Sequence, residues 1–430
     1  MASKTPLVHR DMMVPFALLV TCFAAWGVAA NMTDPLVKVF SKVFTMSTVQ
    51  AALVQFCYYG AYFCLALPAA FINRRYSYKA GVLTGLGLAA AGAILFYPAS
   101  LVMTYGFFLL ALFVLAAGLS ILETSANPFV IAMGPVSNAT RRLNLAQAFN
   151  PVGTNIGVLL AATLILPNLH VATGAERAAI SGEALRAIQS AELTAVMMPY
   201  VSMALVLVLI WVGIAVTRMP TMREISEHGH SEIHFRATLG HLLHNRHYRF
   251  GVVAQFFNVA AQTCTWTFTI QYVQDATGVD EAGAGQYLQY SLLVFLVSRF
   301  IMTLALGYLR PARLLMTMAL AGIVLCTYAV FNVGIYGVWA VVSISACLSL
   351  MFPTIYGIAL HGLGDDTKFG AAGLVMAILG GALMPLVQGA LIDRFGAATS
   401  FIVPAACFLV VAAYGWFDLA SATRKGIVHP

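Results

Sequence analysis

Two carboxylates stand inside long apolar stretches of this sequence, where carboxylates are rare. Asp34 lies in AANMTDP and Glu123 in LSILETSANPF, whereas the other fourteen of the 16 Asp and Glu residues lie in loops, tails or the ends of apolar stretches. An ionised carboxylate at membrane depth costs a few kcal/mol or more, so such a group is functional or kept neutral. No Lys or Arg lies at comparable depth in the N-terminal half. We therefore predict that both acids take up and release protons; the alternative is a protonated acid bonded to a neighbouring helix.

Neutral amides accompany these acids at helical spacing. Asn144, Gln147 and Asn150 follow an i, i+3, i+6 pattern. A second helical face combines Gln255, Asn258, Gln262 and Trp266 at i, i+3, i+7 and i+11. Buried amides without partners are costly, so these faces line a wet cavity or bond each other. Amides and an aromatic ring suit a sugar, whose hydroxyls need donors and acceptors and whose C–H groups need an apolar surface. The predicted substrate-binding residues are Asn31, Asn127, Gln147, Asn150, Asn258, Gln262 and Trp266. Asn144 and Gln255 fit a cavity and helix–helix bonding equally well.

The composition identifies the solvent of most of the surface. Of the 430 residues, 60% are hydrophobic and 9% are charged, against roughly 25% charged in soluble domains. Lipid is therefore the main solvent. The net charge of +7 sits in short loops between apolar stretches, which indicates membrane topology rather than nucleic-acid binding. The seven cysteines lie in apolar stretches without a CxxC pair, so we expect neither a disulfide framework nor a zinc site.

Twelve stretches are long enough to span a bilayer, which takes about 20 apolar residues. They start near Val14, Thr48, Lys79, Tyr105, Leu143, Thr194, Arg249, Ala282, Ala312, Tyr336, Gly370 and Thr399. The pattern predicts an all-α membrane protein with two six-helix bundles, residues 1–217 and 249–430. The polar segment 218–248 holds six of the ten histidines: His228, His230, His234, His241, His244 and His247. We interpret it as a cytoplasmic linker rather than a metal-binding tract, because no Cys or acidic ligand set accompanies the histidines at fixed spacing.

The positions of Lys and Arg predict the orientation. If the N-terminus is cytoplasmic, seventeen of the 23 Lys and Arg residues fall in inner segments and five in outer ones. This asymmetry predicts that both termini face the cytoplasm of a bacterial inner membrane, which requires an even number of spans. Arg299 is the remaining basic residue and lies within the eighth span. It could balance charge, bind an anionic ligand or extend to the inner surface.

Several sequence blocks now carry a resemblance. Six helices, a basic loop and six helices resemble the major facilitator superfamily. Within it, the chain resembles the L-fucose:proton symporter family in the blocks AWGVAANMTD, SYKAGVLTGL, GLSILETSANPF, RLNLAQAFNPVG, AQFFNVAAQTCTW and FPTIYGIALHGLGDDTKFGAA. The resemblance implies two bundles that alternate access to a central site. It also implies a proton-linked acid pair, matched by Asp34 and Glu123, and sugar contacts from Asn31, Gln147 and Asn150.

These observations together predict proton-coupled import of a monosaccharide, L-fucose or a related hexose, by a monomer in the lipid bilayer. Departures from the family pattern at Ala30, Met32, Thr33 and Asn258 lie beside the expected cavity and leave the sugar open. A sodium-coupled glucose or galactose transporter is the alternative, and a drug-efflux carrier would need a larger, more aromatic cavity. We expect no cofactor besides the coupling ion, H⁺ or Na⁺. No arrangement of catalytic residues predicts an enzyme.

Overall fold

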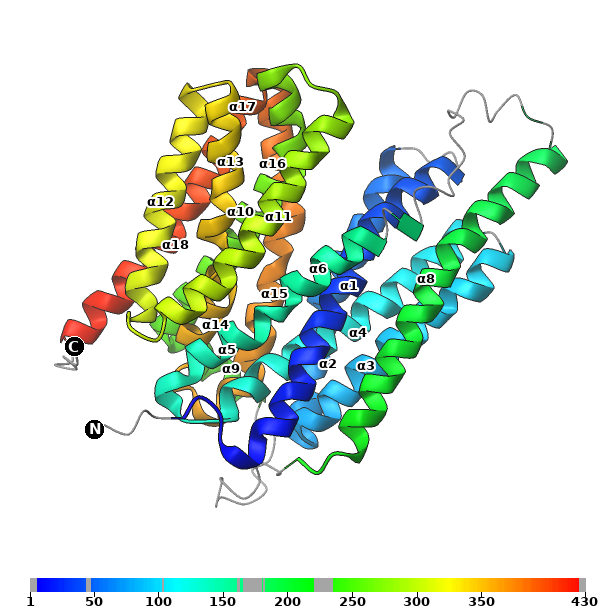
Figure 1. Cartoon of the computed structure of the whole chain (residues 1–430). Helices are drawn as coiled ribbons and strands as arrows, with labels where there is room; N and C mark the ends of the chain where they lie inside the picture. The colour runs from blue at the N-terminus through cyan, green and yellow to red at the C-terminus, as the bar shows by residue number, and fades with distance from the viewer. Residues whose placement is uncertain are drawn as a thin grey trace. The chain divides into compact units, whose positions relative to one another are not determined.

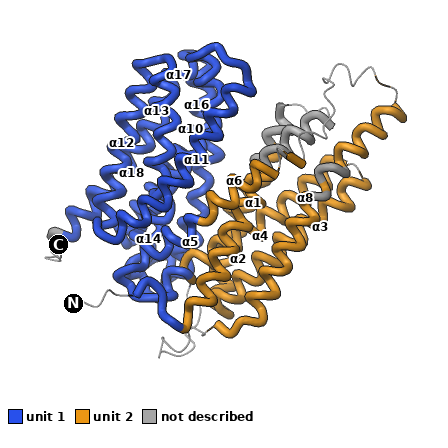
Figure 2. Tube along the Cα trace, viewed as in Figure 1, with its two compact units in different colours: residues 1–10, 130–148, 223–430 blue, residues 11–129, 149–222 orange. Residues whose placement is uncertain are grey.

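The computed structural model describes residues 6–43, 48–102, 104–160, 163–164, 180, 182–219 and 235–424. Within these residues all regular structure is helical, and the chain folds into two compact units (Figures 1 and 2). Unit 1 comprises residues 1–10, 130–148 and 223–430, and unit 2 comprises residues 11–129 and 149–222. Residues 130–148 belong to unit 1 although they precede the linker, and the division into bundles 1–217 and 249–430 stays a prediction.

Unit 2 is built from the long helices of the first half of the chain. They are α1 (Met13–Val43), α2 (Thr48–Arg75), α3 (Tyr78–Val102), α4 (Tyr105–Ala132, as far as residue 129), α6 (Phe149–Leu160) and α8 (Gly182–Val216). The α1 helix packs against α6, and α3 packs against α8. Glycine permits the first contact, because a Cβ at Gly27 would overlap the Asn150 carbonyl and one at Gly153 would overlap the Ala24 carbonyl.

Unit 1 contains a short helix from before the linker and the helices that follow it. They are α5 (Ala139–Gln147), α9 (Phe235–His244), α10 (Arg246–Thr277), α11 (Glu281–Ala305), α12 (Pro311–Phe331), α13 (Ile335–Leu348), α14 (Met351–Leu360), α15 (Thr367–Met376), α16 (Gly380–Phe395), α17 (Ala397–Ser400) and α18 (Ile402–Arg424). The α12 helix packs against α18, and α10 packs against α16 and α18. Cys264, Cys326, Cys347 and Cys407 are buried free thiols in the core of this unit.

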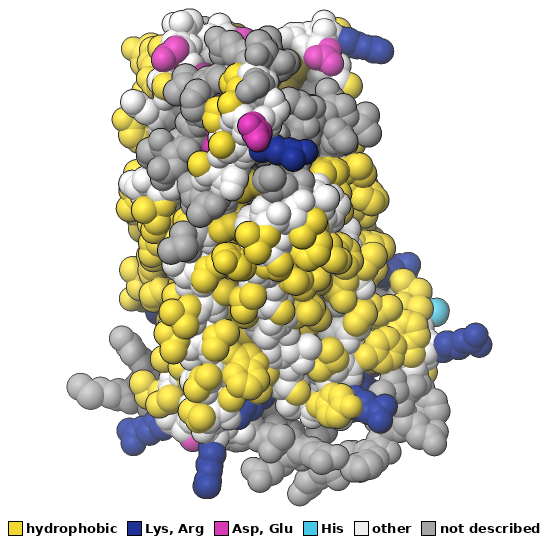
Figure 3. All heavy atoms as spheres, turned by 90° about the vertical axis from the view of Figure 1, so that its right-hand side faces the viewer, with side chains coloured by type: hydrophobic (Ala, Val, Ile, Leu, Met, Phe, Trp, Pro, Cys, Tyr) yellow, Lys and Arg dark blue, Asp and Glu magenta, His cyan; other side chains and the backbone are white. Residues whose placement is uncertain are grey.

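A helix starts within four residues of eleven of the twelve predicted span starts. The exception is Thr194, which lies inside α8, twelve residues after that helix begins at Gly182. Within the described residues, ten helical segments are long and apolar enough to cross a membrane. The two predicted spans that fall short are those that start near Leu143 and Arg249, now α5–α6 and α10. They carry the amide faces, which lower their hydropathy. Figure 3 shows a broad band of hydrophobic side chains on one face of the molecule, with charged side chains toward its two ends.

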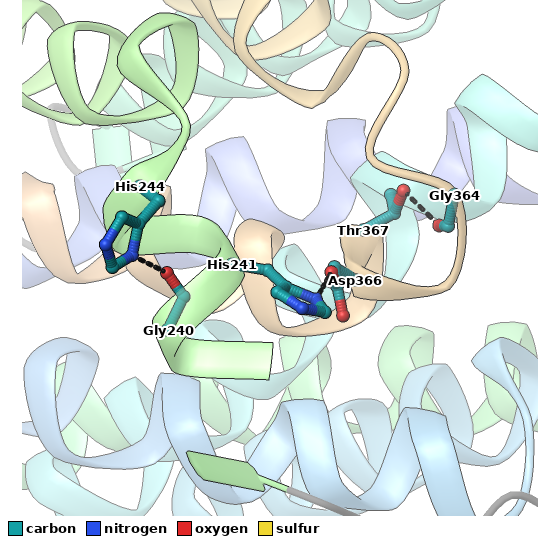
Figure 4. Close-up of polar contacts among 6 residues, drawn as sticks. All are labelled: Gly240, His241, His244, Gly364, Asp366 and Thr367. Carbon is teal, nitrogen blue, oxygen red and sulfur yellow. Dashed lines mark hydrogen bonds and ion pairs between the residues drawn. The ribbon is translucent and has the colours of Figure 1, made fainter. Parts of the chain in front are cut away.

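The predicted linker contains a helix where the structure describes it. Residues 220–234, with His228, His230 and His234, lie outside the described residues. Helix α9 follows, and Nδ1 of its His241 lies 3.4 Å from the Asp366 carboxylate of the neighbouring turn (Figure 4). The rings of Phe235 and Phe369 lie 5.5 Å apart beside this pair. Among the described residues, no three His, Cys, Asp or Glu side chains are placed to hold a metal ion.

Candidate functional site

Glu123 lies on the most deeply buried helix of unit 2. All residues of α4 from Leu115 to Val130 are buried, and Glu123 is 1% exposed. Neither carboxyl oxygen makes a hydrogen bond that meets normal geometry within the described residues. Asn127, one turn further along α4, is the side chain placed to interact with it. A buried carboxyl group without firm partners is costly when ionised, so this group suits proton uptake and release.

An aromatic group that sequence reasoning missed lies near this acid. Tyr62 of α2 is close enough to Glu123 for an electrostatic interaction, and the indole Nε1 of Trp26 donates a 2.8 Å hydrogen bond to the Tyr62 hydroxyl. The Tyr58 ring lies 5.2 Å from the Tyr62 ring. The i, i+4 spacing of the two tyrosines was the available signal, but large aromatic residues at helical spacing usually indicate core packing.

Asn31 and Asn150 are brought together by the close packing of α1 and α6. The Asn31 amide nitrogen donates to the Gly27 carbonyl at 3.0 Å and to the Thr154 hydroxyl at 2.9 Å. The Asn150 amide nitrogen donates to the Phe23 carbonyl at 3.4 Å. Both side chains are partly exposed, and their amide oxygens accept no hydrogen bond from the described residues. The two oxygens are therefore available to accept from a hydroxyl group of a ligand.

The α10 helix carries the predicted amide face of unit 1. Gln255 and Asn258 are fully buried, and neither amide has a hydrogen-bond partner among the described residues. Gln262 and Trp266, nearer the other end, are partly exposed. The Trp266 Nε1 donates a 3.1 Å hydrogen bond to the Ser345 hydroxyl. Only Gln262 and Trp266 are therefore open to a solute in this structure, and contact with Asn258 would require movement.

Arg299 lies beside the aromatic end of this face. The rings of Trp266 and Phe295 pack edge to face at 5.0 Å, and the Arg299 guanidinium lies 4.8 Å from the centre of the Phe295 ring. Arg299 is 4% exposed, and its Nε and Nη1 have no hydrogen-bond partner in the described residues. It stands one turn beyond Phe295, as Gln262 stands one turn before Trp266. A cation–π contact compensates only part of the cost of burying this charge.

The remaining predicted residues are placed as follows. Asn144 binds helices together, since its amide nitrogen donates to the Thr140 carbonyl at 2.9 Å and to the Thr354 hydroxyl at 3.1 Å. Gln147 is buried at the end of α5 in unit 1. Asp34 belongs to α1, but its side chain lies outside the described residues. Glu192, which the sequence placed at a span end, is 2% exposed in α8 and is a second buried carboxyl group.

Comparisons with known proteins agree with this architecture. The model of the Major Facilitator Superfamily matches residues 16–379. The L-fucose-proton symporter of Haemophilus influenzae is 41% identical over 429 residues, with 95% of this chain and 97% of the relative covered. The L-fucose-proton symporter of Escherichia coli is 37% identical, with 96% and 95% covered. The glucose/galactose transporter of Brucella abortus is 36% identical, with 93% of each covered.

A solved crystal structure also matches this chain over almost its whole length. The crystal structure of FucP, a major facilitator transporter in the outward conformation, superimposes with a TM-score of 0.89 at 37% identity, covering 95% of this chain and 99% of that one. The helical fold and the relatives identify this chain as a multi-pass membrane transporter and not an enzyme. Within the superfamily, the chain belongs to the family of the L-fucose-proton symporters.

Proposed function

We propose that this protein is a symporter that imports a monosaccharide, L-fucose or a related hexose, together with protons by alternating access. The observation that carries the proposal is Glu123, a carboxyl group 1% exposed on α4 with no firm hydrogen-bond partner in the described residues. Such a group gains or loses a proton according to the environment that its surroundings provide. Proton coupling requires that this environment differ between the outward-open and inward-open states.

The sugar is recognised by amides and aromatic rings. In unit 2, the free amide oxygens of Asn31 and Asn150 suit hydroxyl donors. In unit 1, Gln262 offers an amide and Trp266 an apolar ring that is fixed by its bond to Ser345. This chemistry favours a small polyhydroxylated solute over a large apolar drug. The names of the Haemophilus and Escherichia relatives support L-fucose as the first candidate.

The protein works as a monomer in the inner membrane, with both termini in the cytoplasm and no cofactor besides the coupling ion. The seventeen-to-five distribution of Lys and Arg supports this orientation. Within unit 1, the first described residues and the end of α18 lie at the same end as α9 (Figure 1). The hydrophobic band in Figure 3 supports contact with lipid.

Uptake into proteoliposomes tests the proposal. Labelled L-fucose, D-glucose, D-galactose and D-mannose are offered under an inward pH gradient and, separately, under an inward sodium gradient. We expect one sugar to accumulate with the pH gradient alone. A protonophore should abolish this accumulation and leave equilibrium exchange intact. If none of the four sugars moves under either gradient, the proposed function is wrong.

Sodium-coupled hexose transport is the second candidate. The Brucella relative, named a glucose/galactose transporter, supports it, as do the departures from the family pattern at Ala30, Met32 and Thr33 beside Asn31. Accumulation driven by sodium alone would establish this alternative. The two acids would then be cation ligands rather than proton carriers.

A further inference from the structure

Arg142, at the start of α5, is a buried cation with no ion-pair partner among the described residues. Its side chain is fully buried, and it is among the largest buried side chains of the protein. A guanidinium has five N–H donors, and five main-chain carbonyls accept from it. They belong to Val130 at 2.7 Å, Leu7 at 2.9 Å, Gly134 at 3.1 Å, Pro135 at 3.2 Å and Ile131. Every donor of Arg142 is therefore matched by main chain.

These carbonyls come from separate segments that meet at one corner. Val130 and Ile131 are in the last turn of α4, where helix carbonyls lack partners within the helix and favour a cation. Gly134 and Pro135 belong to the turn that leads to α5. Leu7 precedes α1, and the same N-terminal stretch is fastened again where the His9 amide donates to the Met133 carbonyl at 3.0 Å. Arg142 thus joins the N-terminal stretch that precedes α1, the end of α4 and the beginning of α5.

Gly134 makes room for this arrangement. A Cβ at Gly134 would lie 2.7 Å from Nη1 of Arg142 and 2.7 Å from the Leu7 carbonyl oxygen. Both distances are below the contact limit, so the guanidinium or the N-terminal stretch would have to move. The backbone of Gly134 does not have the positive φ that excludes alanine. Gly134→Ala therefore disturbs the corner sterically without changing the residue at position 142.

The joined segments lead into helices that carry residues of the proposed proton-coupling and sugar-binding sites. Glu123 lies seven residues before Val130 on α4, and Gln147 lies five residues after Arg142 on α5. At 1.5 Å per helical residue, Glu123 stands roughly 10 Å and Gln147 roughly 7 Å along its own helix from the corner. Asn31 lies on α1, which follows the fastened N-terminal stretch. A displacement at the corner therefore moves the beginning of α5 and, with it, Gln147 within unit 1.

We propose that Arg142 is a positioning residue for transport: by fastening the N-terminal stretch, the end of α4 and the beginning of α5 at one corner, it anchors the helix of Glu123 and holds Gln147 in position. This inference rests on the function proposed above. A purely structural role would lower the amount or the thermal stability of folded protein and leave the properties of each folded molecule unchanged. A positioning role changes those properties, namely sugar affinity and the coupling of sugar to protons.

The test compares Arg142→Lys and Gly134→Ala with the wild type and with Gly106→Ala, a control at the other end of α4 where a Cβ meets nothing within 4 Å. Sugar affinity, counterflow exchange and pH-driven accumulation are measured per folded molecule. A misplacement of about 1 Å can cost up to ~100-fold, so we expect both corner variants to lose about tenfold in affinity or in accumulation relative to exchange. Gly106→Ala should match the wild type.

Hydrogen exchange supplies a readout that does not depend on the sugar. Arg142→Lys offers three donors for five carbonyls. We expect faster exchange at residues 6–12, 130–135 and 139–147 together, with α12 and α18 unchanged. If exchange rises only in α5, or if affinity and coupling per folded molecule equal those of the wild type, the proposal is overturned. If the wild type itself moves no sugar, the proposed function fails, while the exchange result still decides whether Arg142 fastens the three segments.

Discussion

Two buried arginines of this protein differ in how completely their guanidinium groups are hydrogen-bonded. Arg142 is fully buried at the corner between α4 and α5, and carbonyls accept from all five of its donors. Arg299 is 4% exposed on α11, yet its Nε and Nη1 have no hydrogen-bond partner in the described residues, and it stacks only on Phe295. A satisfied buried charge stabilises the fold, whereas an unsatisfied one costs stability and persists where function requires it. Glu123 belongs with Arg299 in this comparison.

The largest effect is expected when the satisfied charge is removed. Arg142→Gln leaves at least three of five buried carbonyls without a donor, at about 1–3 kcal/mol each. We expect a loss of more than roughly 3 kcal/mol of stability, seen as a large fall in Tm in detergent or as failure to fold. The neighbouring Arg141→Gln is the control, because Nε of Arg141 has no partner among the described residues. Equal Tm values for the two variants would remove the distinction between the arginines.

The next effect concerns transport rather than stability. Glu123→Gln removes the titratable group but keeps the shape of a side chain that has no firm partner to lose. We expect pH-driven accumulation of sugar to disappear, while exchange across the membrane persists and Tm changes little. Glu192→Gln, which alters the buried carboxyl group of α8, is the matched control and should still accumulate sugar. Intact accumulation by Glu123→Gln would exclude Glu123 from the mechanism.

The third variant reverses the first. Arg299→Met keeps a long side chain over Phe295 and removes an incompletely paired charge, so we expect Tm to stay equal or to rise. Transport per folded molecule should fall about tenfold if the charge serves the site, which corresponds to about 1.4 kcal/mol. Thermal unfolding and uptake are measured on the same preparation. A large fall in Tm would mean that Arg299 has structural partners and would end the contrast with Arg142.

The sequence predicted the helical architecture better than the partners of individual side chains. Apolar stretches locate helices because bilayer thickness imposes their length. The single face predicted for Asn144, Gln147 and Asn150 assumed one continuous helix, whereas the structure has two, α5 and α6. The exceptional depth of Glu123 was legible from the sequence. What a polar group bonds depends on contacts that are distant in sequence, such as Asn144 with Thr354 or Trp26 with Tyr62. Periodicity carries no information on such pairs.

The corner at Arg142 illustrates the same limit. Arg141 and Arg142 are adjacent in the sequence, and both count as inner basic residues in the predicted orientation. One turns inward to five carbonyls, while the other lies against Gly307. The acceptors belong to the main chain and leave no pattern of side chains. Only the folded backbone reveals that this cation fastens three segments of the chain together.

The smallest effects are expected for two uncharged amides. Like the two arginines, one is hydrogen-bonded to another helix and the other has no partner among the described residues. Asn144 donates to Thr140 and Thr354, whereas Asn258 is equally buried and its amide has no partner in the described residues. Asn144→Leu should lower stability by about 1–2 kcal/mol, since it removes the hydrogen bond to the Thr354 hydroxyl that joins α5 to α14. Asn258→Leu should leave stability unchanged or raise it slightly, because an apolar side chain of similar size replaces an unsatisfied polar one.

Sugar affinity then separates the two amides by function. If Asn258 reaches the sugar during transport, Asn258→Leu weakens binding a few-fold, on the order of 1 kcal/mol, while Asn144→Leu leaves the affinity of folded molecules intact. Thermal unfolding and binding are measured for both variants in the same detergent. A destabilised Asn258→Leu with unchanged affinity would show that Asn258 acquires its partner within the fold, and the rule drawn from the two arginines would not extend to amides.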